Sequence, residues 1–268
     1  MDTAGETVGG EVTIQVTELN DPLGLPAITS PASGQFKDKD TLTLVWTPGE
    51  DEETKAADQT FEVQVNYTGG TNESDWTPVQ AAGYSGQSVS FTVDSGGQNA
   101  TGMKLRIRAT DTGTLKNGSS PATTAWVESQ PYVLDNAPPE VTQDAMVSGG
   151  ASYALGEDAL DSVTYDFTLE DTGDSGLQAY GYFVSNAALA PSDPSAYTMT
   201  DGNTGSYTFD EVGSYYLHLY MVDNVGNVSY KTIGAFNITN TRPLAMDQAV
   251  EVNRGESIEI TLEASDPE

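Results

Sequence analysis

Oxygen-bearing side chains gather where one stretch of alternating residues gives way to the next. The three passages are LNDPLGLP (19–26), LDNAPPE (134–140) and ITNTRP (238–243), each with Asp or Asn shortly before Pro. Calcium takes six to eight oxygen ligands from carboxylates, Asn side chains and backbone carbonyls. These passages and the loops near them therefore predict calcium sites, with these candidate ligands: Glu18, Asn20, Asp21, Asp135, Asn136, Glu140, Glu170, Asp171, Asp174, Asp223 and Asn224.

A plainer interpretation of the same residues stays open. Asp and Asn also make turns, cap chain ends and line solvated loops. The acidic run GEDEETKAAD (49–58) is a further cluster. Consecutive carboxylates in a loop point in different directions, so this run is expected to be a solvated loop.

Aromatic residues offer a second kind of binding site. Tyr216, His218 and Tyr220 alternate with Leu217 and Leu219, so they share one face of a predicted strand. If that face is exposed, the rings form a small strip on which sugar rings could stack. This alternative makes the chain a carbohydrate-binding accessory module of a secreted polysaccharide-degrading enzyme.

Catalytic constellations are missing from the sequence. His218 is the only His and lies inside a predicted strand, whereas nucleophilic or metal-dependent catalysis needs partners converging from other segments. There is no Cys, and no GxSxG, HExxH or phosphate-binding glycine loop. The chain is therefore not expected to be an enzyme.

The net charge of the chain limits the kinds of molecule that it can bind. Forty acidic residues against ten basic ones give a net charge of −30, which repels nucleic acids and anionic membrane surfaces. No apolar stretch approaches the ~20 residues that span a bilayer. Nucleic-acid binding and membrane insertion of this segment are therefore not expected.

The elements that must position these side chains are strands. Apolar residues recur at every second position, as in Leu42, Leu44 and Trp46 or in Leu105 and Ile107. Clusters of Gly, Asp, Asn and Pro separate the runs, and the connections are too short for crossover helices. The pattern predicts an all-β protein of antiparallel β-sandwiches, and the short proline-containing linkers predict that the sandwiches lie end to end.

Several segments resemble known repeats. LTLVWTPGED (42–51) and MKLRIRATD (103–111) resemble the fibronectin type III family and its bacterial Ig-like relatives, and residues 210–229 resemble bacterial Ig-like repeats. VTIQVTELNDP (12–22) and residues 247–268 resemble the tail and the head of cadherin-like repeats of large bacterial surface proteins.

The resemblances carry expectations for particular residues. The fibronectin type III pattern has a Tyr where this chain has Met103, so no tyrosine corner is expected in the first module; Tyr215 stands at the corner position of the second. The cadherin resemblance implies calcium at the junctions, although the full cadherin linker motif is absent.

These observations predict four regions. Residues 1–22 would be the last strand of a preceding repeat with its linker, 23–136 a fibronectin type III-like sandwich, 137–241 a bacterial Ig-like sandwich, and 242–268 the first hairpin of a following repeat. The expected function is a non-catalytic stalk or adhesion segment of a large bacterial secreted or cell-surface protein, stiffened by calcium. The expected partners are neighbouring repeats of the same protein and a glycan or other cell-surface ligand.

Overall fold

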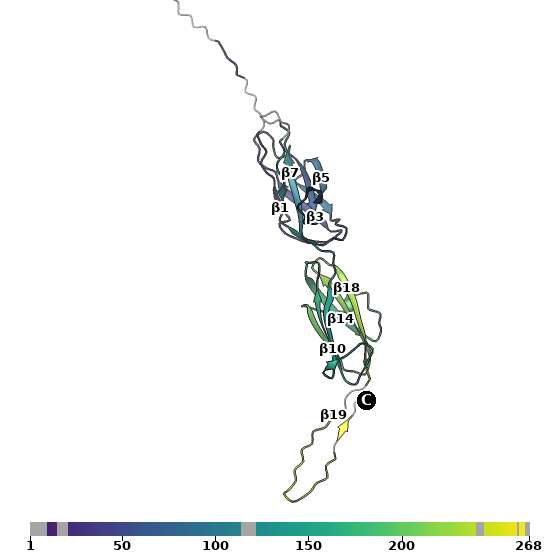
Figure 1. The fold of residues 1–268 in the computed structure, drawn as a ribbon. Coiled ribbons are helices and arrows are strands. Elements are labelled where there is room, and N and C mark those ends of the chain that lie inside the picture. Colours follow the sequence, from purple (N-terminus) through teal and green to yellow (C-terminus); the bar gives the residue numbers. More distant parts are fainter. Residues whose placement is uncertain (1–9, 15–20, 114–121, 240–243, 262, 266–268) are drawn as a thin grey trace, which may run out of the picture.

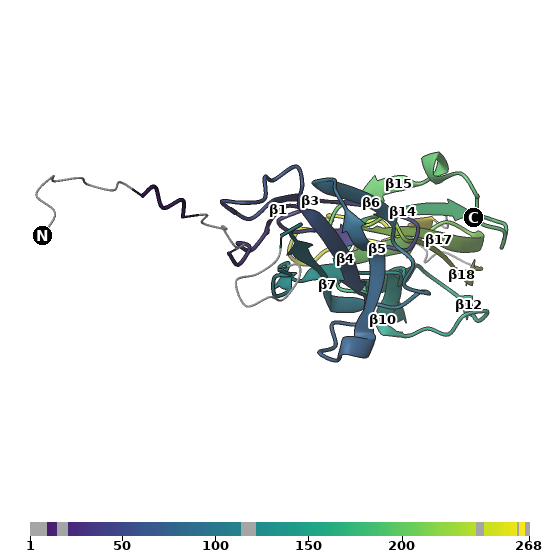
Figure 2. The same ribbon diagram turned by 90° about the horizontal axis from the view of Figure 1, so that it is seen from above.

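The chain forms two β-sandwiches that follow one another (Figure 1). The computed structural model describes residues 10–14, 21–113, 122–239, 244–261 and 263–265. In Figure 2, after a turn of 90°, the strands of the two sandwiches overlap, as expected for units stacked along one axis. The prediction of an all-β protein is confirmed.

The first sandwich contains nine strands. A three-stranded sheet has the order β1-β3-β6, and a second sheet has the order β2-β9-β7-β4-β5, with β8 paired to β7. The bounds are β1 Ala27–Ser30, β2 Gln35–Phe36, β3 Thr41–Thr47, β4 Thr60–Asn66, β5 Trp76–Tyr84, β6 Ser88–Thr92, β7 Ala100–Thr110, β8 Val127–Glu128 and β9 Tyr132–Leu134; a short 3₁₀ turn covers Glu73–Asp75.

The second sandwich repeats this arrangement. One sheet has the order β11-β10-β13-β16 and the other β12-β18-β17-β14-β15. The bounds are β10 Glu140–Ser148, β11 Ala151–Ser152, β12 Asp158–Ala159, β13 Val163–Glu170, β14 Leu177–Ser185, β15 Thr198–Thr200, β16 Thr204–Phe209, β17 Gly213–Asp223 and β18 Val228–Ile238; a 3₁₀ turn covers Pro194–Ala196.

Two details differ from the sequence-based expectation. Each sandwich carries one short parallel pair at a sheet edge, β2 with β9 and β12 with β18, among antiparallel neighbours. The last stretch of the first sandwich also forms two short strands, β8 and β9, where alternation alone would favour one. The break falls before Pro131, which has no N–H to donate to a ladder.

Each sandwich has its own core. In the first, Trp46 packs edge-on against Phe61 with ring centroids 5.3 Å apart. In the second, Phe236 stacks on Phe209 at 4.4 Å. The Tyr215 hydroxyl donates to the carbonyl of Val212 at 3.2 Å, which is the bond of a tyrosine corner. The alternating apolar residues therefore lie where the sequence pattern expected them.

An arginine is buried on the outer face of β7. The Arg106 guanidinium lies between the rings of Trp76 and Trp126, 4.3 and 4.2 Å from their centroids, and pairs with Glu73. Only 4% of Arg106 is exposed. The alternation of apolar and polar residues along β7 predicts a solvent-exposed side chain at this position. The two Trp side chains cover it instead and contribute cation–π attraction.

The segments outside the sandwiches contain little regular structure. Residues 10–14 form no strand, because a strand needs a hydrogen-bonded partner. Near the other end, β19 (Leu244–Ala245) pairs with β20 (Ala264–Ser265) and closes a wide hairpin (Figure 1). No helix in the described part of the chain is long and apolar enough to cross a membrane.

Candidate metal centre

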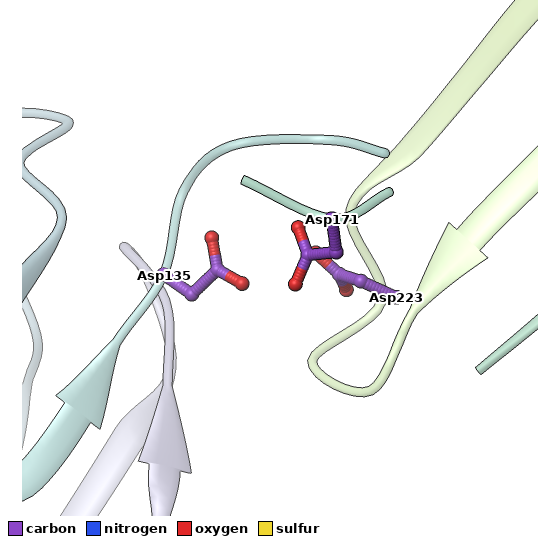
Figure 3. Close-up of side chains that lie close together, drawn as sticks. All are labelled: Asp135, Asp171 and Asp223. Atoms are coloured by element: carbon purple, nitrogen blue, oxygen red, sulfur yellow. The ribbon is translucent and has the colours of Figure 1, made fainter. Parts of the chain in front are cut away.

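Three aspartates converge where the first sandwich meets the second. Asp135 follows β9 in the linker, Asp171 directly follows β13, and Asp223 is the last residue of β17. One carboxylate oxygen from each lies within 4.8 Å of the other two. Figure 3 shows the three side chains pointing toward one another from three separate segments. The strands bring them together because β13 and β17 end at the face of the second sandwich that the linker enters.

Each carboxylate is held by backbone N–H groups of its own loop or a neighbouring one. Asp135 accepts from the N–H of Ala137 at 2.9 Å and of Ser175 at 3.1 Å. Asp171 accepts from the N–H of Gly176 at 2.6 Å, and Asp223 accepts from the N–H of Asn227 at 2.7 Å. These bonds fix the oxygens in position without neutralising their charge.

The electrostatics of the cluster favour a bound cation. Asp135 and Asp223 are fully buried, and none of the three carboxylates forms an ion pair with Lys or Arg among the residues described. Burial raises the pKa of the Asp135 carboxyl, and the neighbouring Asp171 charge raises it further. An all-oxygen, all-carboxylate donor set suits a hard ion such as calcium or magnesium. The residues present therefore fit the expected calcium.

Direct hydrogen bonds also join the two sandwiches here. Gln35 donates to the carbonyl of Ser175 at 3.1 Å, and the Lys37 ammonium donates to the carbonyl of Gly226 at 2.7 Å. Asn227 donates to the carbonyl of Asp135 at 3.1 Å. Loops of the second sandwich thus form hydrogen bonds with the linker. They also bond to β2 and to Lys37, which directly follows β2 in the first sandwich.

Gly173 is required for this packing. A Cβ at this position would overlap the Asp135 carboxylate, so a side chain here would displace Asp135 from the cluster. The loop after Asp171 can therefore approach the linker only with glycine here. Neither Gly173 nor Ser175 was among the expected site residues, and only the loop geometry reveals their part.

The remaining candidate ligands lie elsewhere. Asn136 faces the first sandwich, where its Oδ1 accepts from the Asp38 N–H at 2.7 Å. Asn224 supports the loop by donating to the Ser175 carbonyl at 2.8 Å. Glu140 and Glu170 are exposed partners across β10 and β13, and Asp174 is exposed with a φ of 72°. Asp21 lies at the far end of the first sandwich, while Glu18 and Asn20 fall outside the described residues.

The residues of the proposed aromatic strip are buried to different extents, since Tyr216 and Tyr220 are half-buried. His218 is fully buried, with its ring near those of Phe183 and Tyr216 at centroid distances of 6.0 and 6.5 Å. Tyr220 packs against Tyr197 and Tyr230 at 5.8 and 5.3 Å. The connection between β14 and β15 supplies Tyr197 and lies over this face, so the three residues form part of an aromatic cluster.

His218 makes the second sandwich sensitive to acid. Burial lowers the pKa of its imidazole, although Nε2 lies 3.1 Å from the Ala187 carbonyl. The unfolded chain therefore binds a proton more readily than the folded one, and stability falls as pH drops through the ordinary His pKa toward the folded value. We expect His218→Gln to flatten this part of the stability profile below about pH 6.5, measured by urea unfolding followed by circular dichroism. An unchanged profile in the variant would assign the pH dependence to other groups.

Comparison with known proteins gives structural likeness only. No protein-family model and no curated protein sequence matches the chain. Fibronectin(III)-like modules of Clostridium thermocellum CbhA are 11% identical with a TM-score of 0.26, over 85% of this chain and 100% of theirs. The FN1–FN3 domains of chicken CNTN1 are 11% identical with a TM-score of 0.33, over 83% of this chain and 68% of theirs.

The structure of a bacterial adhesin is also similar to that of this chain. A 1.5-MDa bacterial ice-binding adhesin, whose structure addresses its retention on the host cell surface, is 13% identical with a TM-score of 0.39, over 84% of this chain and 69% of its own. The chain's own sheets, rather than these likenesses, define it as an all-β protein built from two β-sandwiches.

Proposed function

We propose that the chain is a non-catalytic structural and adhesion segment of a secreted or cell-surface bacterial protein, and that calcium at the junction fixes one sandwich on the next. The convergence of Asp135, Asp171 and Asp223 is the observation that carries the proposal. The excess of acidic residues and the absence of Cys are compatible with such a setting. The partners would be neighbouring repeats of the same protein, together with a glycan or another cell-surface ligand.

The division of the three carboxylates between segments explains how a cation would stiffen the joint. Asp135 is continuous with β9 of the first sandwich, whereas Asp171 and Asp223 belong to loops of the second. Bound calcium would counter the negative charge of the three carboxylates, which form no ion pair with Lys or Arg among the described residues. Their backbone hydrogen bonds already hold the oxygens close together, so little further ordering is needed. The hydrogen bonds from Gln35 and Lys37 restrain the same joint.

Scattering and thermal melting test the proposal together. In calcium we expect small-angle scattering to report an extended particle with a narrow range of inter-sandwich angles, and melting of the second sandwich at a higher temperature. A cation that binds only the folded state adds about 2.7 kcal/mol at a hundredfold excess over its Kd. In chelator the range of angles should widen before either sandwich unfolds. Identical scattering and melting in both buffers would remove calcium from the proposed function.

A further inference from the structure

Two oxygen atoms are buried without a hydrogen-bond partner at the other end of the first sandwich. They are Oδ2 of Asp51, in the connection between β3 and β4, and Oε1 of Gln59, just before β4. Gln59 is fully buried, and its Nε2 donates to the carbonyl of Gly49 at 2.8 Å. That bond holds the carboxamide against the turn that carries Asp51. A buried acceptor without a hydrogen-bond partner is unfavourable, and a cation would satisfy either oxygen.

More negative charge surrounds these oxygens. Glu53 lies beside Asp51, because its backbone N–H donates to Oδ1 of Asp51 at 3.2 Å. The backbone N–H of Asp21 reaches Oε2 of Glu53 at 3.4 Å, so the segment that leads into β1 lies beside the cluster. Lys55 is the only basic residue of the 49–58 run, and it forms no ion pair among the described residues. No basic side chain of this run therefore pairs with its carboxylates among the described residues.

A hollow in the surface lies beside Asp51. Asp21, Gly49, Asp51 and Thr54 are among the residues that line a hollow of about 600 Å³. The hollow lies at the end of the first sandwich that receives the preceding chain, as the Asp135 cluster lies at the corresponding end of the second.

The two ends are built from corresponding parts of the fold. Asp21 precedes β1 as Asp135 precedes β10, and the connection after β3 supplies Asp51 as the connection after β13 supplies Asp171. Among the described residues only the second end brings three carboxylates within 4.8 Å of one another. At the first end, the structure instead buries one oxygen each of Asp51 and Gln59 without a hydrogen-bond partner.

We propose that Asp51 Oδ2 and Gln59 Oε1 are ligands of a second divalent-cation site, with calcium as the preferred ion and Glu53 as the adjacent carboxylate. A Gln carbonyl oxygen and carboxylate oxygens are hard donors of the kind that calcium takes. The site shares the proposed calcium chemistry of the junction but none of its residues. Each sandwich would then hold a cation where the chain enters it.

The conservative variant Asp51→Asn isolates one oxygen. Oδ1 of Asp51 accepts from the Glu53 N–H at 3.2 Å, and Asn can keep that bond while its amide replaces only the unpartnered Oδ2. Asp58→Asn is the matched control, because Asp58 is exposed at the end of the same acidic run and the charge change is equal. Asp171→Asn reports separately on the junction.

Calorimetric titration of the full chain with calcium chloride tests the proposal. We expect two binding events in the parent chain and in Asp58→Asn. In Asp51→Asn one of them should weaken by at least about tenfold, and in Asp171→Asn the other should weaken. Two events that both persist unchanged in Asp51→Asn would overturn the second site and leave the junction intact. If the parent chain showed only one binding event and Asp171→Asn abolished it, the second site would likewise be overturned and the junction site retained. If the parent chain bound no calcium, both proposals would be overturned.

Discussion

Replacing Trp46 with Ala is expected to destabilise the first sandwich by about 3–5 kcal/mol and to leave the second unchanged. Trp46 is 1% exposed and packs against Phe61 and Tyr84. Its Nε1 is buried without a hydrogen-bond partner, so truncation also removes an unsatisfied donor. The loss should therefore fall at the lower end of the range. Trp46→Phe, which keeps an aromatic ring and removes that donor, should cost less.

Phe236→Ala is the reciprocal variant. Phe236 is fully buried and stacks on Phe209, within a core cluster that shares no residue with that of Trp46. The loss should again be about 3–5 kcal/mol, now in the second sandwich. The two cores predict two separate unfolding transitions.

Fluorescence separates the two transitions. The chain has three Trp, and Trp46, Trp76 and Trp126 all belong to the first sandwich. Trp emission therefore follows the first sandwich alone, while far-ultraviolet circular dichroism follows both. In urea, Trp46→Ala should shift the fluorescence midpoint, and Phe236→Ala should shift only the part of the circular dichroism change that fluorescence does not report. If both variants moved one common transition, the sandwiches would unfold as a single unit.

Alternation predicted the cores well because one face of each strand must leave water. Leu42, Leu44 and Trp46 are all buried in β3, and the intervening residues are exposed or half-buried. The same rule failed at Arg106, whose cover comes from Trp76 and Trp126 on other segments. Period-two patterns describe one strand, and they carry no information on what another segment lays over its polar face.

The candidate metal centre was predictable only as a set of possibilities. With forty acidic residues, many pairs lie near a predicted linker. Asp135, Asp171 and Asp223 converge because β9, β13 and β17 end at one joint, which depends on sheet order and register. The acidic run 49–58 was expected to be solvated, and four of its five acidic residues are exposed, whereas Oδ2 of Asp51 is buried. Gln59, which lies outside that run, donates to the Gly49 carbonyl at 2.8 Å, a contact that the sequence of the run alone does not reveal.

The junction should tolerate Asp171→Asn without calcium and lose stability from it in calcium. In chelator, the variant relieves repulsion among three close carboxylates but weakens the 2.6 Å bond from Gly176, a loss of about 1 kcal/mol. These effects oppose each other, so the free energy of unfolding should change little. In saturating calcium, the variant should lose most of the stabilisation that binding gives the parent chain, about 2.7 kcal/mol at a hundredfold excess over Kd.

Asp174→Asn provides the control within the same loop. Asp174 is exposed and has a φ of 72°, a conformation that Asn adopts readily. The change in charge is identical, so its effect should stay within about 0.5 kcal/mol in both buffers. Urea unfolding followed by circular dichroism, with calcium and with chelator, measures all four combinations.

The pattern across the four combinations assigns the role of Asp171. An equal loss in calcium and in chelator would mean that Asp171 acts only through its hydrogen bonds to the loop. Equal behaviour of the two Asn variants would mean that net charge, rather than position, governs the joint. A calcium-dependent loss confined to Asp171→Asn is the outcome required by a cation that binds between the linker and the loops of the second sandwich, because only that carboxylate lies within reach of both Asp135 and Asp223.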